Sequence, residues 1–108
     1  MHTNEQFIKA LNRKKEEAFQ MLFKDYYASL VMYAMHYVRQ EVAEDIVQDV
    51  ITELYSRRLL FDTPVALKSF LFLSVKNKAL KIVSYLSQVK RWTYNNTSNF
   101  YSLRQKKN

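Results

Sequence analysis

The sequence contains no cysteine and no glycine, and its one proline is Pro64. Without cysteine the chain can form neither a disulfide nor a thiolate metal site, and a reducing compartment is compatible with it. Turns between strands depend on glycine and proline, so the scarcity of both favours helices joined by short polar loops. No apolar run approaches the roughly 18 residues that span a bilayer. Residues 1–10 do not have the pattern of a signal peptide.

Acidic residues are missing from the second half of the chain. All ten Asp and Glu residues lie within residues 1–62, whereas residues 63–108 carry nine Lys or Arg and no acid. The net charge of the whole chain is +7. A basic half without acidic residues is typical of a protein that binds nucleic acid. Binding to an anionic membrane surface is the competing interpretation.

Apolar residues, by contrast, are plentiful and recur with helical spacing. Hydrophobic residues make up 48% of the 108 residues, which is enough for the core of one compact domain. We therefore expect an all-α fold, a compact antiparallel helical bundle of three main helices plus a short N-terminal helix. The spacing predicts these helices over residues 3–11, 15–39, 42–55 and 66–89.

The predicted helices form a single domain over residues 1–91. Residues 92–108 are rich in Asn, Ser, Tyr and basic residues, and we expect a flexible linker or tail there. Gln40 and Glu41 form so short a link that the second and third helices should be antiparallel.

Two helix starts carry capping signals. Thr3 and Gln6 have the spacing of a capping box, with Thr3 as the N-cap. Pro64 marks the loop before the last helix and fits the first turn of that helix, with Asp62 or Thr63 as its cap.

The third predicted helix has an acidic face of one sign. In the stretch VAEDIVQDVITELY (residues 42–55), apolar pairs alternate with polar pairs, so one helix face is buried and the other exposed. Asp45 and Asp49 lie at i,i+4 spacing, where like charges repel by about 0.2–0.5 kcal/mol. A helix that needs only to be soluble would mix the signs, so we interpret this face as a docking surface for a basic partner. Its candidate contact residues are Glu44, Asp45, Gln48, Asp49 and Thr52.

Two other interpretations of the acidic face stay open. The first is a solvated surface without a partner, which is what runs of charged residues usually are. A carboxylate-bridged metal site would need Glu-x-x-His pairs on facing helices, and neither His2 nor His36 is placed that way. The chain also lacks a Gly-rich phosphate loop and a Ser/His/Asp set in a supporting motif. We therefore expect no metal, no cofactor and no enzymatic activity.

The last predicted helix carries a basic polar stripe. Lysine side chains neutralise phosphates, and aromatic rings can stack on unpaired bases with a gain of roughly 1–3 kcal/mol per base. Phe61, in the preceding loop, is about equally suited to a base contact and to the core, whereas Phe70 belongs to the core. The candidate nucleic-acid contacts are Phe61, Lys68, Ser74, Lys76, Asn77, Lys78, Lys81, Lys90 and Arg91.

Three stretches in this order carry a family resemblance. They are the aromatic start from Ala18-Phe19 to Tyr27, AEDIVQDV (residues 43–50) and SFLFLSVKNKAL (residues 69–80). Together they resemble the region-2 domain of extracytoplasmic-function (ECF) sigma factors, which are promoter-specificity subunits of bacterial RNA polymerase. The similarity covers about residues 7–91.

The resemblance implies a function with two partners. In such proteins the acidic helix docks on the coiled coil of the polymerase clamp, and Asp45, Gln48 and Asp49 occupy the positions of the central contacts. The loop at residues 61–68 and the helix residues 76–78 would bind the non-template strand of the −10 promoter element and help to open it. It also implies a cytoplasmic location and, in many members, an anti-sigma factor as a third partner.

The chain departs from the family pattern at several points. Lys81 and Ser84 stand where the family usually has an acid and an arginine, although Lys90 and Arg91 can supply the charge. The sequence has no second domain that would bind the −35 element, so we expect a fragment, the alternative being a sigma-like protein without that half.

A different function stays open as well: a helical interaction or adaptor module with no role in nucleic-acid binding.

Overall fold

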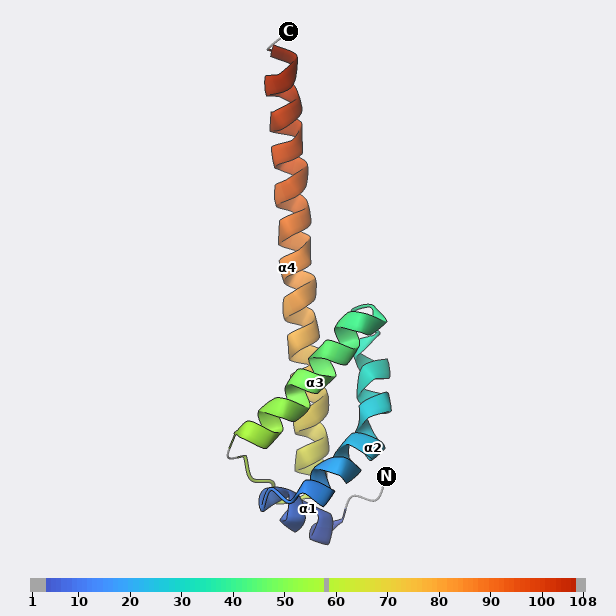
Figure 1. The fold of residues 1–108 in the computed structure, drawn as a ribbon. Coiled ribbons are helices and arrows are strands. Elements are labelled where there is room, and N and C mark those ends of the chain that lie inside the picture. Colours follow the sequence, from blue (N-terminus) through green and yellow to red (C-terminus); the bar gives the residue numbers. More distant parts are fainter. Residues whose placement is uncertain (1–3, 58, 107–108) are drawn as a thin grey trace.

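The protein is a bundle of four α-helices in the part of the chain that the structure describes (Figure 1). The structure, a computed structural model, describes residues 4–57 and 59–106, with side chains up to residue 96. The helices are α1 (Glu5–Asn12), α2 (Glu16–Ala34), α3 (Gln40–Ser56) and α4 (Pro64–Lys106). The expectation of an all-α bundle is confirmed.

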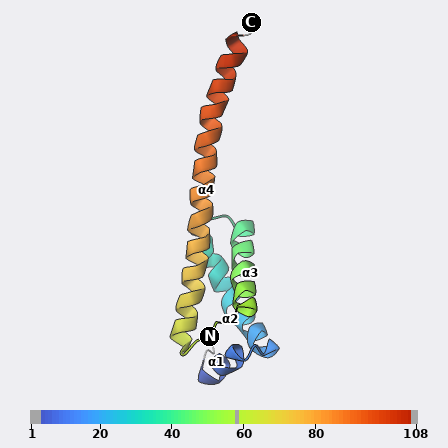
Figure 2. The ribbon, with the colours of Figure 1, turned by 90° about the vertical axis from the view of Figure 1, so that its left-hand side faces the viewer.

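The three long helices pack around a common core. α2 and α3 run in opposite directions, α4 lies along both, and α1 crosses one end of the bundle (Figures 1 and 2). Each fully buried aliphatic side chain contributes about 1.5–3 kcal/mol. The largest side chains with almost no exposed surface come from α2, α3 and α4: Leu22, Tyr26, Leu30, Val47, Val50, Leu54, Leu67, Leu71 and Val75.

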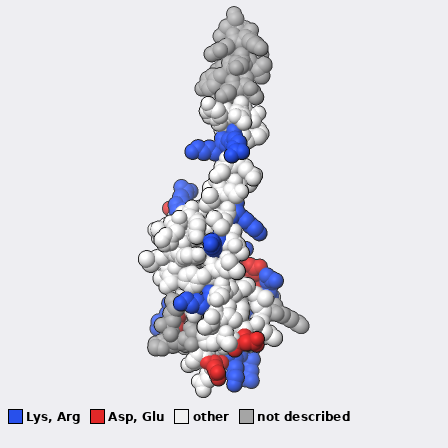
Figure 3. Space-filling model, turned by 180° about the vertical axis from the view of Figure 1, so that it is seen from behind, with Lys and Arg blue, Asp and Glu red and all other residues white. Residues whose placement is uncertain are grey.

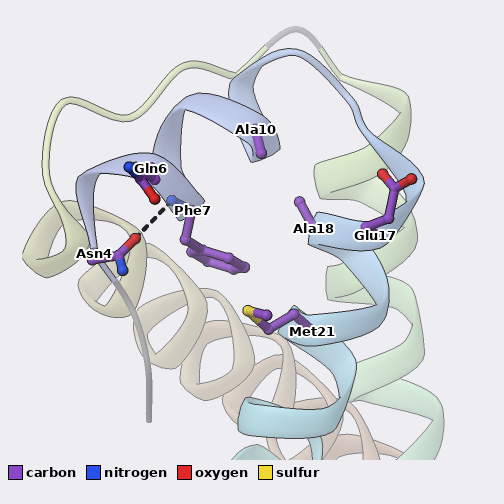
Figure 4. A pocket seen from close by; sticks show the side chains of 7 residues that line it. All are labelled: Asn4, Gln6, Phe7, Ala10, Glu17, Ala18 and Met21. Carbon is purple, nitrogen blue, oxygen red and sulfur yellow. Dashed lines mark hydrogen bonds between the residues drawn. The ribbon is translucent and has the colours of Figure 1, made fainter.

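α1 begins at Glu5 because Asn4 caps it. The Asn4 side chain accepts a hydrogen bond from the Phe7 N–H at 2.9 Å, and the Phe7 ring points toward Met21 of α2 (Figure 4). The expected capping box with Thr3 as N-cap is therefore wrong. Asn is at least as good an N-cap as Thr, and the helix starts one residue later than predicted. Thr3 itself lies outside the described residues.

The link between α2 and α3 is longer than predicted and lies earlier in the chain. α2 ends at Ala34, and residues 35–39 form the connection to Gln40. The Tyr37 and Val38 N–H groups both donate to the Ala34 carbonyl, at 2.9 and 3.1 Å. Gln40 and Glu41 thus belong to the first turn of α3, and the link itself contributes half-buried side chains to one end of the bundle.

The turn between α1 and α2 holds the loop between α3 and α4. The Asn12 amide donates to the Phe61 carbonyl at 2.9 Å and accepts from the Phe61 N–H at 3.0 Å. Lys14, which has a left-handed backbone (φ 59°), donates from Nζ to the carbonyls of Leu54 (2.7 Å) and Arg57 (2.6 Å). A cation at these carbonyls satisfies the C-terminal end of α3 and complements its dipole.

α4 starts at Pro64, two residues before the start that the apolar spacing predicts, and ends much later than predicted. Thr63 accepts a hydrogen bond from the Ala66 N–H at 3.1 Å, which confirms it as the cap, and Pro64 occupies the first turn. The helix continues past Val89 to Lys106 and reaches about 65 Å at 1.5 Å per residue. It therefore projects far beyond the other helices (Figures 1 and 2). The role of residues 92–108 as a separate linker stays a prediction.

Candidate functional site

The acidic face of α3 is exposed. Ala43, Ile46, Val47, Val50 and Leu54 turn inward and are buried, so the polar residues between them face outward. Asp45, Gln48, Asp49 and Thr52 are all exposed, and Glu44 is half-buried with its carboxylate 3.3 Å from the Gln40 amide. Among the described side chains, no Lys or Arg forms an ion pair with Asp45 or Asp49. We call Asp45, Gln48, Asp49 and Thr52 the acidic stripe.

A hollow lined by aromatic rings lies beside the acidic stripe. It has a volume of about 400 Å³ and is formed by Phe19 and Phe23 of α2 with Thr52 and Tyr55 of α3. The Phe19 and Tyr55 rings meet edge to face with centroids 4.9 Å apart. Phe23 and Tyr55 keep 47% and 58% of their surface exposed. The sequence predicted the acidic face but not this aromatic surface. The signal that could have revealed it is the apolar stripe of α2, which is wider than two neighbouring helices can cover.

The acidic and basic helices are joined by an ion pair. Glu53 of α3 lies 3.5 Å from the Lys78 ammonium of α4 and 2.9 Å from the Arg57 guanidinium. The Arg57 hydrogen bond, with a further contribution from the Lys78 charge, holds the pKa of Glu53 below its ordinary value. Lys78 is therefore held by α3 while its side chain stays partly open to solvent.

The predicted basic residues of α4 do not form one patch. At about 100° per residue, Ser74, Asn77, Lys78 and Lys81 share the side of α4 that borders α3, whereas Lys76 lies about 160° from Lys78. Asn77, Lys81 and Lys76 are exposed, and Ser74 is half-buried. We call Ser74, Asn77, Lys78 and Lys81 the basic stripe.

The remaining basic candidates extend this charge along the helix. Lys68 is exposed in the first turns of α4, and Lys90 and Arg91 are exposed on its projecting part. Figure 3 accordingly shows basic side chains at separate heights, with no acidic side chain on the described projecting part of the face in view.

Phe61 belongs to the core. Its side chain is only 9% exposed, its ring lies 5.4 Å from the Phe70 ring, and its backbone is held on both sides by Asn12. This placement favours the core over a base contact for the Phe61 ring, because only a small part of the residue faces solvent. Leu60, in the same loop, and Val65, in the first turn of α4, are exposed instead.

The described residues offer neither a membrane-spanning helix nor a metal-binding cluster. None of the helices there is both long and apolar enough to cross a membrane. The described His, Asp and Glu side chains also include no group of three or more that is arranged to hold a metal ion.

Comparison with known proteins identifies the family. The family model described as Sigma-70 region 2 matches residues 22–93, which are 72 of the 108 residues. The matched segment holds most of α2, all of α3, and α4 through Thr93, so both stripes lie inside it. No curated protein and no solved structure matched the chain. The chain therefore belongs to the sigma-70 region 2 family, whose members are sigma-factor domains of transcription initiation.

Proposed function

We propose that this chain is the region-2 domain of an ECF-type sigma factor, docking on the polymerase clamp and binding and opening the promoter −10 element. The observation that carries the proposal is the acidic stripe, an exposed surface of one sign on a helix at the centre of the family match. Nothing in a four-helix bundle requires such a surface, and the repulsion within it lowers the stability of α3 slightly.

The polymerase side combines charge with apolar area. Asp45 and Asp49 supply unpaired carboxylates for a basic coiled coil, and complementary charge of this kind raises the association rate and sets the register. Gln48 and Thr52 add neutral hydrogen-bonding groups, and Glu44 borders them. The neighbouring aromatic hollow offers Phe23 and Tyr55, a type of side chain that often carries binding energy in interfaces.

The DNA side is the basic stripe together with Lys68, Lys90 and Arg91. A lysine row along one helix side can neutralise successive phosphates of a single strand. Unstacking a base costs a few kcal/mol, which such phosphate contacts and local base contacts would offset. Lys76 lies on the opposite flank of α4, so we leave it out of this surface, and we leave out Phe61 because it is buried.

The polymerase assignment is tested by removing charge without changing size. Asp45→Asn combined with Asp49→Asn should weaken binding to core RNA polymerase by about 10-fold, since both carboxylates are exposed and unpaired. The measurement is the dissociation constant of a fluorescently labelled chain titrated with the core enzyme. Glu17→Gln, an exposed carboxylate on α2 away from the acidic stripe, is the matched control.

Equal affinity for the double variant, the control and the parent chain would remove the acidic stripe from the interface. Failure of the parent chain to bind the core enzyme would favour the alternative function of a helical adaptor module.

A further inference from the structure

The apolar face of α4 continues past the end of the bundle. Val75 and Ala79 are fully buried between α2 and α3. Ile82, Leu86 and Val89 follow them at helical spacing, but Ile82 is half-buried, and Leu86 is 55% exposed. Tyr85 and Trp92, on the adjoining side of the helix, are 64% and 65% exposed. Contiguous apolar surface of this kind marks an interaction site.

Ile82 and Leu86, at the start of this uncovered face, form part of one wall of a groove. The floor is made by the link before α3 and the first turn of α3, with Val38, Arg39 and Val42, and the wall by Ile82, Leu86 and Lys90 of α4. The groove has a volume of about 710 Å³, and most of its lining is apolar. The wall from Ile82 to Lys90 is about 12 Å long at 1.5 Å per residue, which matches roughly two turns of a helix. We call this feature the α4 groove.

The charged side chains that line the α4 groove are basic. Arg39 stands at the floor and Lys90 on the wall. The Arg39 guanidinium lies 3.3 Å from Glu41, but both side chains are largely exposed, and such pairs hold their partners weakly. α4 itself contains no acidic residue. An occupant of the groove must therefore bring apolar side chains to the wall and carboxylates to its edges.

A second copy of the chain does not meet this requirement. If two copies packed their projecting helices together, Lys90 and Arg91 of one copy would approach Arg39 and Lys90 of the other. Each copy also carries a net charge of +7, so net long-range repulsion would oppose the association.

We propose that the α4 groove binds an amphipathic helix of another protein, with an apolar face flanked by Glu or Asp residues. None of the acidic-stripe residues lines the groove, so this partner would occupy a surface separate from the proposed polymerase contact. Only Lys90 is shared with the proposed DNA surface. Helix-in-groove recognition uses apolar anchors at i, i+3, i+4 and i+7, which fits the length of the wall.

The proposal is tested with a designed peptide and no polymerase or DNA. The probe is a labelled 16-residue helix with leucines on one face and glutamates flanking them; its counterpart carries lysines in place of the glutamates. Fluorescence anisotropy should show the acidic peptide binding the full chain at least about 10-fold more tightly than the lysine peptide. Leu86→Ser and Lys90→Glu should each reduce the affinity about 5- to 10-fold.

Two controls separate the groove from unspecific attraction. Leu73→Ser removes an exposed leucine from the opposite side of α4, and Lys24→Glu reverses an exposed charge on α2. Both should bind the acidic peptide within about 2-fold of the parent chain, because neither lines the groove. Equal binding of the two peptides, or equal loss in the controls and the groove variants, would overturn the proposal. So would a dimer in light scattering that Leu86→Ser converts to a monomer.

Discussion

At the residue scale, Asn12 at the end of α1 and Lys14 in the turn after it organise contacts far away in the sequence. Asn12 satisfies both backbone groups of Phe61, 49 residues later, and Lys14 reaches the carbonyl of Leu54, 40 residues later. Partial burial lowers the pKa of the Lys14 amine, and the same ammonium lies 5.7 Å from the centre of the Phe19 ring. The buried position of Phe61 thus depends on hydrogen bonds as well as on apolar packing.

Removal of the Asn12 side chain should destabilise the fold. Asn12→Ala leaves a partly buried N–H and C=O of Phe61 without partners, and unsatisfied buried groups cost about 1–3 kcal/mol. Urea unfolding followed by circular dichroism gives the change in free energy. Asn77→Ala, on the exposed side of α4, is the control and should change stability by about 0.5 kcal/mol or less. A similar effect of the two substitutions would contradict the importance of the Asn12–Phe61 contact.

Glu53 gives the stability an acid-dependent component. The Arg57 hydrogen bond is the main cause that lowers the pKa of Glu53 in the folded chain. The ionised carboxylate therefore stabilises the fold fully above pH 4.5, the ordinary pKa, and this stabilisation is lost as the pH falls through the lower pKa of the folded state. Ion pairs this exposed contribute about 0.2–1 kcal/mol. The parent chain should be more stable than Glu53→Gln at pH 7, and the difference should shrink below pH 4.5. Thermal unfolding between pH 7 and 3 measures it; a constant difference would exclude this role of Glu53.

At the element scale, an ion pair couples the acidic helix α3 to the basic helix α4, so their two surfaces are not independent. The Glu53–Lys78 pair places a carboxylate of α3 against the basic stripe. Lys78 can contact a phosphate only by sharing or leaving that carboxylate. The basic stripe in the free chain is therefore partly neutralised by the helix that is proposed to bind polymerase.

Release of Lys78 from Glu53 should strengthen DNA binding. Glu53→Gln should raise the affinity for a single-stranded −10-like oligonucleotide about 2- to 5-fold, because one more ammonium is free to neutralise a phosphate. Lys78→Ala should lower the affinity and reduce the slope of log K against log salt by about 0.7. Anisotropy titrations at several salt concentrations measure both, with Lys24→Ala as the control. A weaker complex with Glu53→Gln than with the parent chain would show that the pair does not restrain Lys78.

At the scale of the whole molecule, the projecting part of α4 dominates the shape. The radius of gyration is 20.1 Å and the longest extent is 73 Å. A compact domain of this length would have a radius of gyration of about 13 Å. Much of α4 thus lies outside the core, where no other described helix supports it.

Small-angle X-ray scattering measures this shape in solution. A helix that stays straight to Lys106 predicts a radius of gyration of about 20 Å for the monomer, with the mass checked by light scattering. A monomer with a value near 13 Å would mean that α4 folds back onto the bundle.

Local patterns predicted most of the fold and the acidic stripe. Apolar pairs placed α3 and its exposed face correctly, and Thr63-Pro64 predicted the start of α4, because both signals act within one or two helix turns. The position of Phe61 could not be predicted in the same way, since it depends on a side chain 49 residues away. The end of α4 was missed because few apolar residues follow Val89, whereas helix continuation needs only the absence of a breaker such as Gly or Pro.

The Asn12–Phe61 contact has a practical consequence for the boundaries of the domain. The family match begins at Leu22, so a version of the chain trimmed to residues 22–93 would lack α1, Asn12 and Lys14. Such a fragment would keep both charged stripes but lose the hydrogen bonds from Asn12 and Lys14 that hold the end of α3 and the loop before α4. Residues 4–21, although outside the recognised family segment, are thus part of the smallest unit that keeps this architecture intact.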